Sequence, residues 1–175
     1  MTDEALMAKF IEGDRGAFEV LFQRYSQPIH GYLLRMVGSE AQADDLTQAT
    51  FLSVLRARER FRAGAAFRPW LYAIATNAAR DQHRRRRPEE PIEQAASEVE
   101  EPLAHVDPFQ REAVRGALAR LPETQRVPIV LHRFEGLSFA EIAEVLGATE
   151  TAVKVRAHRG YEKLRELLGH LEAER

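Results

Sequence analysis

Residues 68–87, RPWLYAIATNAARDQHRRRR, combine side-chain types that hold nucleic acid. The stretch contains six arginines, with Trp70 and Tyr72 near its start, in a chain whose formal net charge is −2. Residues 56–87 carry ten basic and two acidic side chains, a local charge of +8. Positive charge concentrated on one segment favours contact with phosphate groups. We therefore predict a nucleic-acid contact here; the alternative is a charged helix end, because cations suit a helix C-terminus.

A second pattern predicts a helix-turn-helix between residues 137 and 167. Ser138 and Glu141 have the spacing of a capping box at a helix start. Gly147 suits the left-handed position that follows a helix, and Thr149 can cap the next helix. A short helix, a glycine-bearing turn and a longer basic helix are the parts of a DNA-reading helix-turn-helix.

The longer of these helices has an inward and an outward face, since successive residues turn by about 100°. The inward side chains are Val153, Ala157, Leu164 and Leu168. The side chains predicted to meet DNA are Thr149, Thr151, Lys154, Val155, Arg156, His158, Arg159 and Lys163. Arginine and lysine donate to guanine edges or phosphates, and valine touches the thymine methyl group. The alternative is a solvated amphipathic helix with ordinary surface charge.

Apolar residues at helical spacing run through almost all of the remaining chain, and no segment alternates like a β-strand. Three polar residues are expected to cap helices: Asp3, Asp14 and Ser39. Ser39 has Gln42 three residues on, which is the spacing of a capping box. Pro28 is expected to interrupt or kink its helix, and Pro128 to kink its helix or reset the start.

The charge pattern divides the chain into three parts. Residues 88–109 hold seven acidic side chains and no lysine or arginine, and prolines recur through them. Such a composition is typical of an extended linker. We expect an all-α fold of two small helical domains, residues 1–87 and 108–175, joined by a flexible acidic linker, residues 88–107. The second domain ends in the helix-turn-helix.

Composition excludes several classes of protein. The chain has no cysteine, so disulfides and thiolate metal sites are excluded. It contains no P-loop, GxGxxG or HExxH motif, and its six histidines lack metal-like pairing; His132 and Glu135, three residues apart, are an ordinary surface pair. We expect no enzyme activity, no cofactor and no metal. The acidic start, and the lack of an apolar run of about eighteen residues, predict a cytoplasmic protein without membrane insertion.

Four stretches taken together carry a family resemblance over almost the whole chain. They are AFEVLFQRYSQPIHGYLLRMVG, ADDLTQATFLSVLRARERF, FRPWLYAIATNAARDQHRRRR and the stretch from LARLPETQRV to YEKLREL. In this order they resemble the bacterial sigma-70 family, specifically the small two-domain extracytoplasmic function (ECF) sigma factors. The resemblance implies a protein that binds core RNA polymerase and directs promoter recognition, strand opening and transcription initiation.

The resemblance also implies a role for each group of residues. The first domain holds the polymerase and opens the promoter −10 element, and the second reads the −35 element. The residues that match the segment docking on the polymerase β′ clamp helices are Asp44, Asp45, Leu46, Gln48 and Phe51. The residues that match the −10 segment are Phe67, Arg68, Trp70, Asn77, Arg80, His83, Arg84 and Arg85. The implied partners of this monomer are core RNA polymerase (β′ clamp helices and β flap), promoter DNA and an anti-sigma factor.

Alternatives stay open for several of these residues. Asp44 and Asp45 can favour the first turn of their helix through its dipole, and Trp70 can be a core residue. The linker either threads through the basic active-site cleft of the polymerase or is a soluble tether. The alternative function is a stand-alone helix-turn-helix regulator, which would bind DNA specifically without polymerase.

Overall fold

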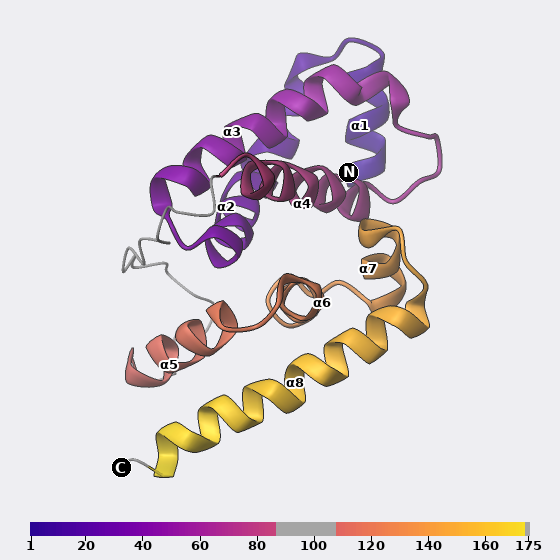
Figure 1. Ribbon diagram of the computed structural model, residues 1–175. Helices are drawn as coiled ribbons and strands as arrows, with labels where there is room; N and C mark the ends of the chain where they lie inside the picture. Colours follow the sequence, from indigo (N-terminus) through magenta and orange to yellow (C-terminus); the bar gives the residue numbers. More distant parts are fainter. Residues whose placement is uncertain (87–107, 174–175) are drawn as a thin grey trace.

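The structure, a computed structural model, describes residues 1–86 and 108–173, and the regular elements of these residues are all helices (Figure 1). The predicted all-α fold of two helical domains is confirmed. The predicted linker, residues 88–107, lies outside the described residues. Within the two described ranges, no helix is both long enough and apolar enough to cross a membrane.

The first domain packs its helices around α2. Its elements are α1 (Asp3–Ile11), α2 (Arg15–Val37), α3 (Glu40–Ala57), the 3₁₀ turn η1 (Arg58–Arg60) and α4 (Phe67–Arg85). Helix α2 packs against α1, α3 and α4, and α4 also lies against α3 and α1. The helix that carries the arginine-rich stretch is therefore held from three sides.

Tyr32 and Tyr72 join α2 to α4 in the core. Both rings are fully buried and meet edge to face, with 5.4 Å between their centroids. The Tyr32 hydroxyl lies 2.8 Å from the hydroxyl of Thr76, which donates to the Tyr72 carbonyl oxygen at 2.6 Å. Because a buried hydroxyl without a partner is costly, these hydrogen bonds fix how α4 lies on α2.

The first two helix starts differ in how well they were predicted. Asp14 caps α2 as expected, and its carboxylate accepts from the Ala17 N–H at 3.3 Å. Helix α1 instead has Thr2 as its cap, with the hydroxyl accepting from the Ala5 N–H at 3.2 Å. The prediction of Asp3 as the cap is wrong, because the Asp3 carboxylate bonds to side chains of α2.

The expected cap at the start of α3 is also wrong. Ser39 precedes α3, but its side chain makes no cap bond, so the capping box with Gln42 is not formed. Glu40 places an acid in the first turn instead, where its charge suits the helix dipole. Neither Pro28 nor Pro128 interrupts its helix. A proline inside a helix costs about 3 kcal/mol, and the burial of apolar neighbours offsets that cost.

The second domain contains the predicted helix-turn-helix. Its helices are α5 (Pro108–Ala119), α6 (Glu123–Arg133), α7 (Phe139–Leu146) and α8 (Glu150–Ala173). The capping box of Ser138 and Glu141 is formed in both directions, and Gly147 ends α7 with a φ of 59°. Thr149 accepts from the Ala152 N–H at 3.1 Å. All three local predictions for this motif are confirmed.

The two domains contact each other through α4 with α7 and through α2 with α5 and α6. The long helix α8 packs on α5, α6 and α7. In Figure 1 it runs along the side of α6 that is away from the first domain. The face of α8 predicted to read DNA is therefore not needed to hold the domains together.

Close approach of α8 to α6 depends on Gly160. A methyl group at this position would lie 2.5 Å from Ile129 Cδ1 and 3.3 Å from the Gln125 carbonyl oxygen. Ile129 is buried and has little room to move. The glycine is needed here for space, because its helical backbone is one that any residue adopts.

We expect Gly160→Ala to lower the free energy of unfolding by about 1–3 kcal/mol, the cost of overpacking a filled core. Gly169 lies on the same helix with nothing within 4 Å of an added methyl group. The control Gly169→Ala should raise stability by up to about 1 kcal/mol, since alanine favours a helix. Urea denaturation followed by circular dichroism measures both variants. Equal stability of the two would contradict the packing described for Gly160.

Candidate nucleic-acid interface

The outward face of α8 is exposed as predicted. Thr151, Lys154, His158 and Arg159 are exposed, and Val155 is 44% exposed, although it is apolar. On the opposite side, the inward residues Val153 and Ala157 are buried and Leu164 and Leu168 are partly buried. Of the other residues in the predicted DNA-reading set, Thr149 and Lys163 are exposed and Arg156 is partly buried.

Some of the predicted DNA-reading side chains form ion pairs within α8 itself. Lys154 lies 3.1 Å from Glu150, and His158 lies 3.2 Å from Glu162. Such exposed pairs are worth only about 0–1 kcal/mol, so a phosphate can replace the carboxylate at little cost. Arg159 makes no ion pair with any residue that the structure describes. The face is therefore free to meet a groove of DNA.

The beginning of α4 lies in a cluster of aromatic rings. Phe67 is 1% exposed and packs against Tyr25 and Phe61. Trp70 is partly buried, and its ring meets Phe61 edge-on at 5.1 Å. Phe67 is thus a core residue. The packing of Trp70 agrees with the alternative in which Trp70 is also a core residue.

The rest of α4 presents polar groups to solvent. Asn77 is exposed, and its amide makes no hydrogen bond within the described residues. His83, Arg84 and Arg85 are also exposed, and Arg84 pairs only with Asp81 of the same helix, at 2.7 Å. These four side chains of the predicted −10 set are exposed, so they can contact nucleic acid without any change in the conformation described.

Two arginines of the same set are engaged by the second domain. Arg80 Nε lies 2.7 Å from a carboxylate oxygen of Glu123 at the start of α6. Arg68 donates to the carbonyl oxygen of Glu135, in the segment between α6 and α7. Sequence reasoning did not anticipate these contacts, because nothing local to either arginine indicates which acidic residues lie beside it.

Glu135 is the centre of the contact between the domains. Its side chain is 7% exposed; it accepts from the Tyr72 hydroxyl at 2.5 Å and lies 3.5 Å from Arg35 Nη1. The Arg35 guanidinium also lies over the Phe134 ring, 4.4 Å from its centroid. Burial raises the pKa of Glu135, and the Tyr72 hydrogen bond and the arginine charges only partly oppose it. Burial and the Glu135 charge raise the pKa of Tyr72 as well.

His132 and Glu135, the surface pair in the sequence, do not act together. His132 Nδ1 donates to the Leu137 carbonyl oxygen at 2.8 Å, and its ring stacks on Phe139. Both residues are therefore used in packing. In residues 1–86 and 108–173 no three histidine, aspartate or glutamate side chains are grouped so that they could hold a metal ion.

Helix α3 carries the set predicted to bind the polymerase. Asp44, Asp45 and Gln48 are exposed, whereas Leu46 and Phe51 are buried and hold the helix in place. Asp44 lies 2.9 Å from His30 Nε2 of α2. The buried pair can support this surface without contacting a partner directly.

An apolar patch beside this set was missed by sequence reasoning. Phe22 is 43% exposed and Leu52 is 44% exposed. The Phe22 ring meets the buried Phe51 edge-on at 4.8 Å, and a shallow pocket is lined by Phe18, Glu19, Phe22 and Gln23. Phe22 has the helical spacing of a core residue, but with α1 and α3 packed on α2 its side chain remains exposed.

Comparison with protein-family models finds two matches, in chain order. The model described as Sigma-70 region 2 matches residues 21–89. The model described as Sigma-70, region 4 matches residues 111–164. The first match contains α3 and α4, and the second contains the helix-turn-helix.

Similar proteins of known identity cover nearly the whole chain. RNA polymerase sigma factor CarQ of Myxococcus xanthus is 46% identical over 96% of this chain and 98% of its own length. ECF RNA polymerase sigma factor SigM of Mycobacterium tuberculosis is 37% identical over 97% of this chain and 86% of its own length. Among solved structures, CnrH in complex with the cytosolic domain of CnrY matches with a TM-score of 0.77 and 29% identity, covering 96% of this chain and 97% of CnrH.

We expect Glu135→Gln to remove one component of the pH dependence of stability. The pKa of Glu135 is raised in the folded protein from an ordinary value near 4.5, so between these two values the folded chain binds more protons than the unfolded chain. The wild-type free energy of unfolding should therefore fall, relative to the Gln variant, as the pH rises from 4.5 through the raised pKa.

Urea denaturation of both proteins from acid to neutral pH measures this difference. Glu144→Gln is the control, because Glu144 is exposed on α7 and its side chain makes no hydrogen bond or ion pair with another described residue. Parallel pH profiles for the wild type and Glu135→Gln would show that Glu135 is not buried in the folded protein.

Proposed function

The chain belongs to the ECF group of the sigma-70 family, and from this premise we propose that it binds core RNA polymerase and directs promoter recognition, strand opening and transcription initiation. The observation that carries this function is the order of the two regions: a region 2 match that contains α3 and α4, followed by a region 4 match that contains α7, the turn and α8 as far as residue 164. A stand-alone regulator has no need of the first region and is not favoured. The bonds of the RNA are made by the polymerase.

We propose that residues 1–87 bind the polymerase and recognise and open the −10 element, that residues 108–175 read the −35 element, and that residues 88–107 connect them. The exposed Asp44, Asp45 and Gln48 on α3 suit the β′ clamp helices, and the buried Leu46 and Phe51 keep that surface in shape. The exposed Phe22 adds apolar area beside the polar row, which is the composition of a protein interface. The β flap is the proposed partner of the second domain.

Helix α4 is proposed to open and hold the −10 element. An unpaired base leaves the stack only if a polar group receives its edge, and the free amide of Asn77 can do so. His83, Arg84 and Arg85 follow along the same helix and can contact the phosphates of a single strand. Phe67 supports the start of the helix from the core and makes no direct contact in the described conformation.

Helix α8 is proposed to read the −35 element from the major groove. Arg159 is exposed and has no protein partner in the described residues, and it can donate two hydrogen bonds to a guanine edge. Val155 can contact a thymine methyl group. The lysines and His158 exchange their exposed carboxylate partners for phosphates.

Binding of the −10 element requires a rearrangement. Arg80 must leave Glu123, and Arg68 must leave the Glu135 carbonyl oxygen, before either meets a phosphate. We propose that the polymerase draws the domains apart and that an anti-sigma factor keeps the chain from it. The solved complex of CnrH with the cytosolic domain of CnrY supports a protein partner of this kind.

The experiment that tests the function is reconstitution with purified core RNA polymerase, followed by genome-wide run-off transcription. We expect new start sites that share two upstream motifs at constant spacing. Specific DNA binding by the chain alone, without new transcripts and without polymerase binding, would contradict the proposal in favour of a stand-alone regulator.

Arg159→Ala should weaken binding of the holoenzyme to duplex promoter by about 1–3 kcal/mol, the value of one bidentate base contact. Specificity at one −35 base pair should be lost together with this affinity. Arg165, exposed on the same helix outside the predicted set, provides the control Arg165→Ala. Equal affinities of Arg159→Ala and the control, measured by fluorescence anisotropy with duplex promoters, would contradict the role of Arg159.

Asn77→Ala should leave the closed complex nearly unchanged and slow strand opening. The reason is that its amide meets a base edge only after that base has left the duplex. Fluorescence of 2-aminopurine in the −10 element reports opening, and Gln27→Ala, which alters an exposed amide of α2, is the control. A loss of closed-complex affinity as large as that of Arg159→Ala would contradict this division of roles.

A further inference from the structure

The N-terminus of α4 has no cap of its own. The residue before the helix is Ala66, whose side chain accepts no hydrogen bond, and no acid stands in the first turn. The first N–H groups of any helix lack intrahelical partners and need acceptors from elsewhere. In the helix that carries the predicted −10 contacts, the acceptor comes from another part of the chain.

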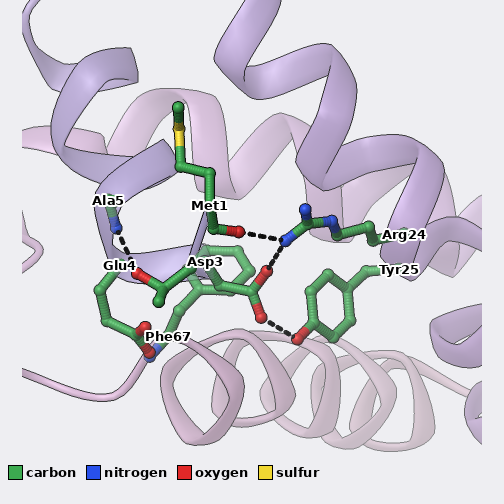
Figure 2. A network of polar contacts seen from close by, with 8 residues as sticks. Met1, Asp3, Glu4, Ala5, Arg24, Tyr25 and Phe67 are labelled. Atoms are coloured by element: carbon green, nitrogen blue, oxygen red, sulfur yellow. Dashed lines mark hydrogen bonds and ion pairs between the residues drawn. The ribbon is translucent and has the colours of Figure 1, made fainter.

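Glu4 of α1 supplies this acceptor. Its Oε1 lies 3.0 Å from the backbone nitrogen of Phe67, which donates the hydrogen bond across 63 positions of sequence (Figure 2). A carboxylate is also the preferred charge at a helix N-terminus, since the helix dipole is positive there. Glu4 therefore acts as a long-range cap of α4.

Neighbouring contacts hold Glu4 in position. Asp3, the preceding residue, lies 2.8 Å from Arg24 Nη1 and accepts from the Tyr25 hydroxyl. Arg24 also donates to the Met1 carbonyl oxygen at 3.1 Å. As Figure 2 shows, the start of α1 is thus fastened to α2 by Asp3 and to α4 by Glu4.

The same contacts fix the loop that leads into α4. Phe61 and Phe67, at its two ends, are buried with 6.2 Å between ring centroids, and the Tyr25 ring meets Phe67 at 5.5 Å. Between the two phenylalanines the chain turns at Gly64, with a φ of 82°. Phe67 is held by its ring from one side and by its N–H from the other. Its position sets where the loop ends and where α4 begins.

We propose that Glu4 is a positioning residue for promoter opening, which caps α4 and thereby holds the exposed face of α4 where DNA is proposed to meet it. This inference rests on the proposed function. A side chain that captures a single base must be held within a fraction of an ångström, and its supporting shell provides that precision. Loosening the first turn of α4 should therefore impair capture of the base more than attachment to the polymerase.

The test measures the rate constant of opening for a promoter identified by run-off transcription with the wild-type holoenzyme. Glu4→Ala should slow opening about 2- to 30-fold, the range that corresponds to the loss of a helix cap. Affinity for core polymerase should stay within about twofold. Glu12→Ala, which removes an exposed carboxylate at the end of α1, is the control and should open at the wild-type rate.

A second variant restores a local cap. Ala66 has extended backbone angles, φ −71° and ψ 129°, which suit an N-cap aspartate. Glu4→Ala combined with Ala66→Asp should recover most of the lost rate. Restoration of the rate by a carboxylate at a different position would show that capping of α4, and no other property of Glu4, is required.

The outcomes separate the two proposals. No opening by the wild-type holoenzyme on any promoter would refute the proposed function itself. Normal opening by the wild type together with an unchanged rate constant for Glu4→Ala would overturn only the role of Glu4. A smaller opening amplitude with an unchanged rate constant would identify a purely structural role and also overturn it. If Glu4→Ala does not fold, Glu4→Met is measured in its place, because methionine keeps the length of the side chain and removes the oxygen that accepts from the Phe67 N–H; an unchanged rate constant then counts against the proposal.

Discussion

A carboxylate buried between the two domains is the constraint on which their arrangement depends. Glu135 has a side chain that is only 7% exposed, and a charge removed from water is costly unless donors or opposite charges meet it. Tyr72 and Arg35 meet it at 2.5 and 3.5 Å. Both belong to the first domain, whereas Glu135 follows α6 in the second. These two partners offset the burial of Glu135 in part, and they do so only while α2, α4 and the end of α6 lie close together. Sliding of the domains would separate the Glu135 carboxylate from both.

Two arginines of α4 already have partners in the second domain. Arg80 pairs with Glu123, and Arg68 with a backbone carbonyl oxygen, so a phosphate must replace partners that already exist. Because each replacement exchanges one polar contact for another, the net free energy of binding DNA is smaller than the new contacts alone would give. A component that separates the domains removes this competition without touching DNA itself. If the polymerase separates the domains as proposed, binding of the chain to the polymerase and binding to the promoter are linked through the same interface.

Local signals explain which parts of the fold could be predicted from sequence. The helix-turn-helix depends on Ser138, Gly147 and Thr149, and each acts within three or four residues of its own position. The outward face of α8 follows from helical spacing for the same reason. The prediction for Asp3 failed because a polar residue near a helix start can have competing partners, and nothing in the structure explains why Ser39 makes no cap bond. The Asp3 carboxylate bonds across to α2, and that choice depends on tertiary packing, which no local spacing reveals.

The contacts that could not be predicted are those joining residues far apart in sequence. The stretch before α4 carries no local cap, and this lack is visible in the sequence as Ala66 followed by a first turn without acid. It indicates that an acceptor must come from elsewhere but not which residue supplies it. Glu4 does so only because Asp3 fastens α1 to α2 and α2 in turn packs on α4. A helix that lacks its own cap is thereby made dependent on the whole domain, and the precision with which its side chains are placed, including those proposed to meet DNA, is a property of that domain rather than of the helix.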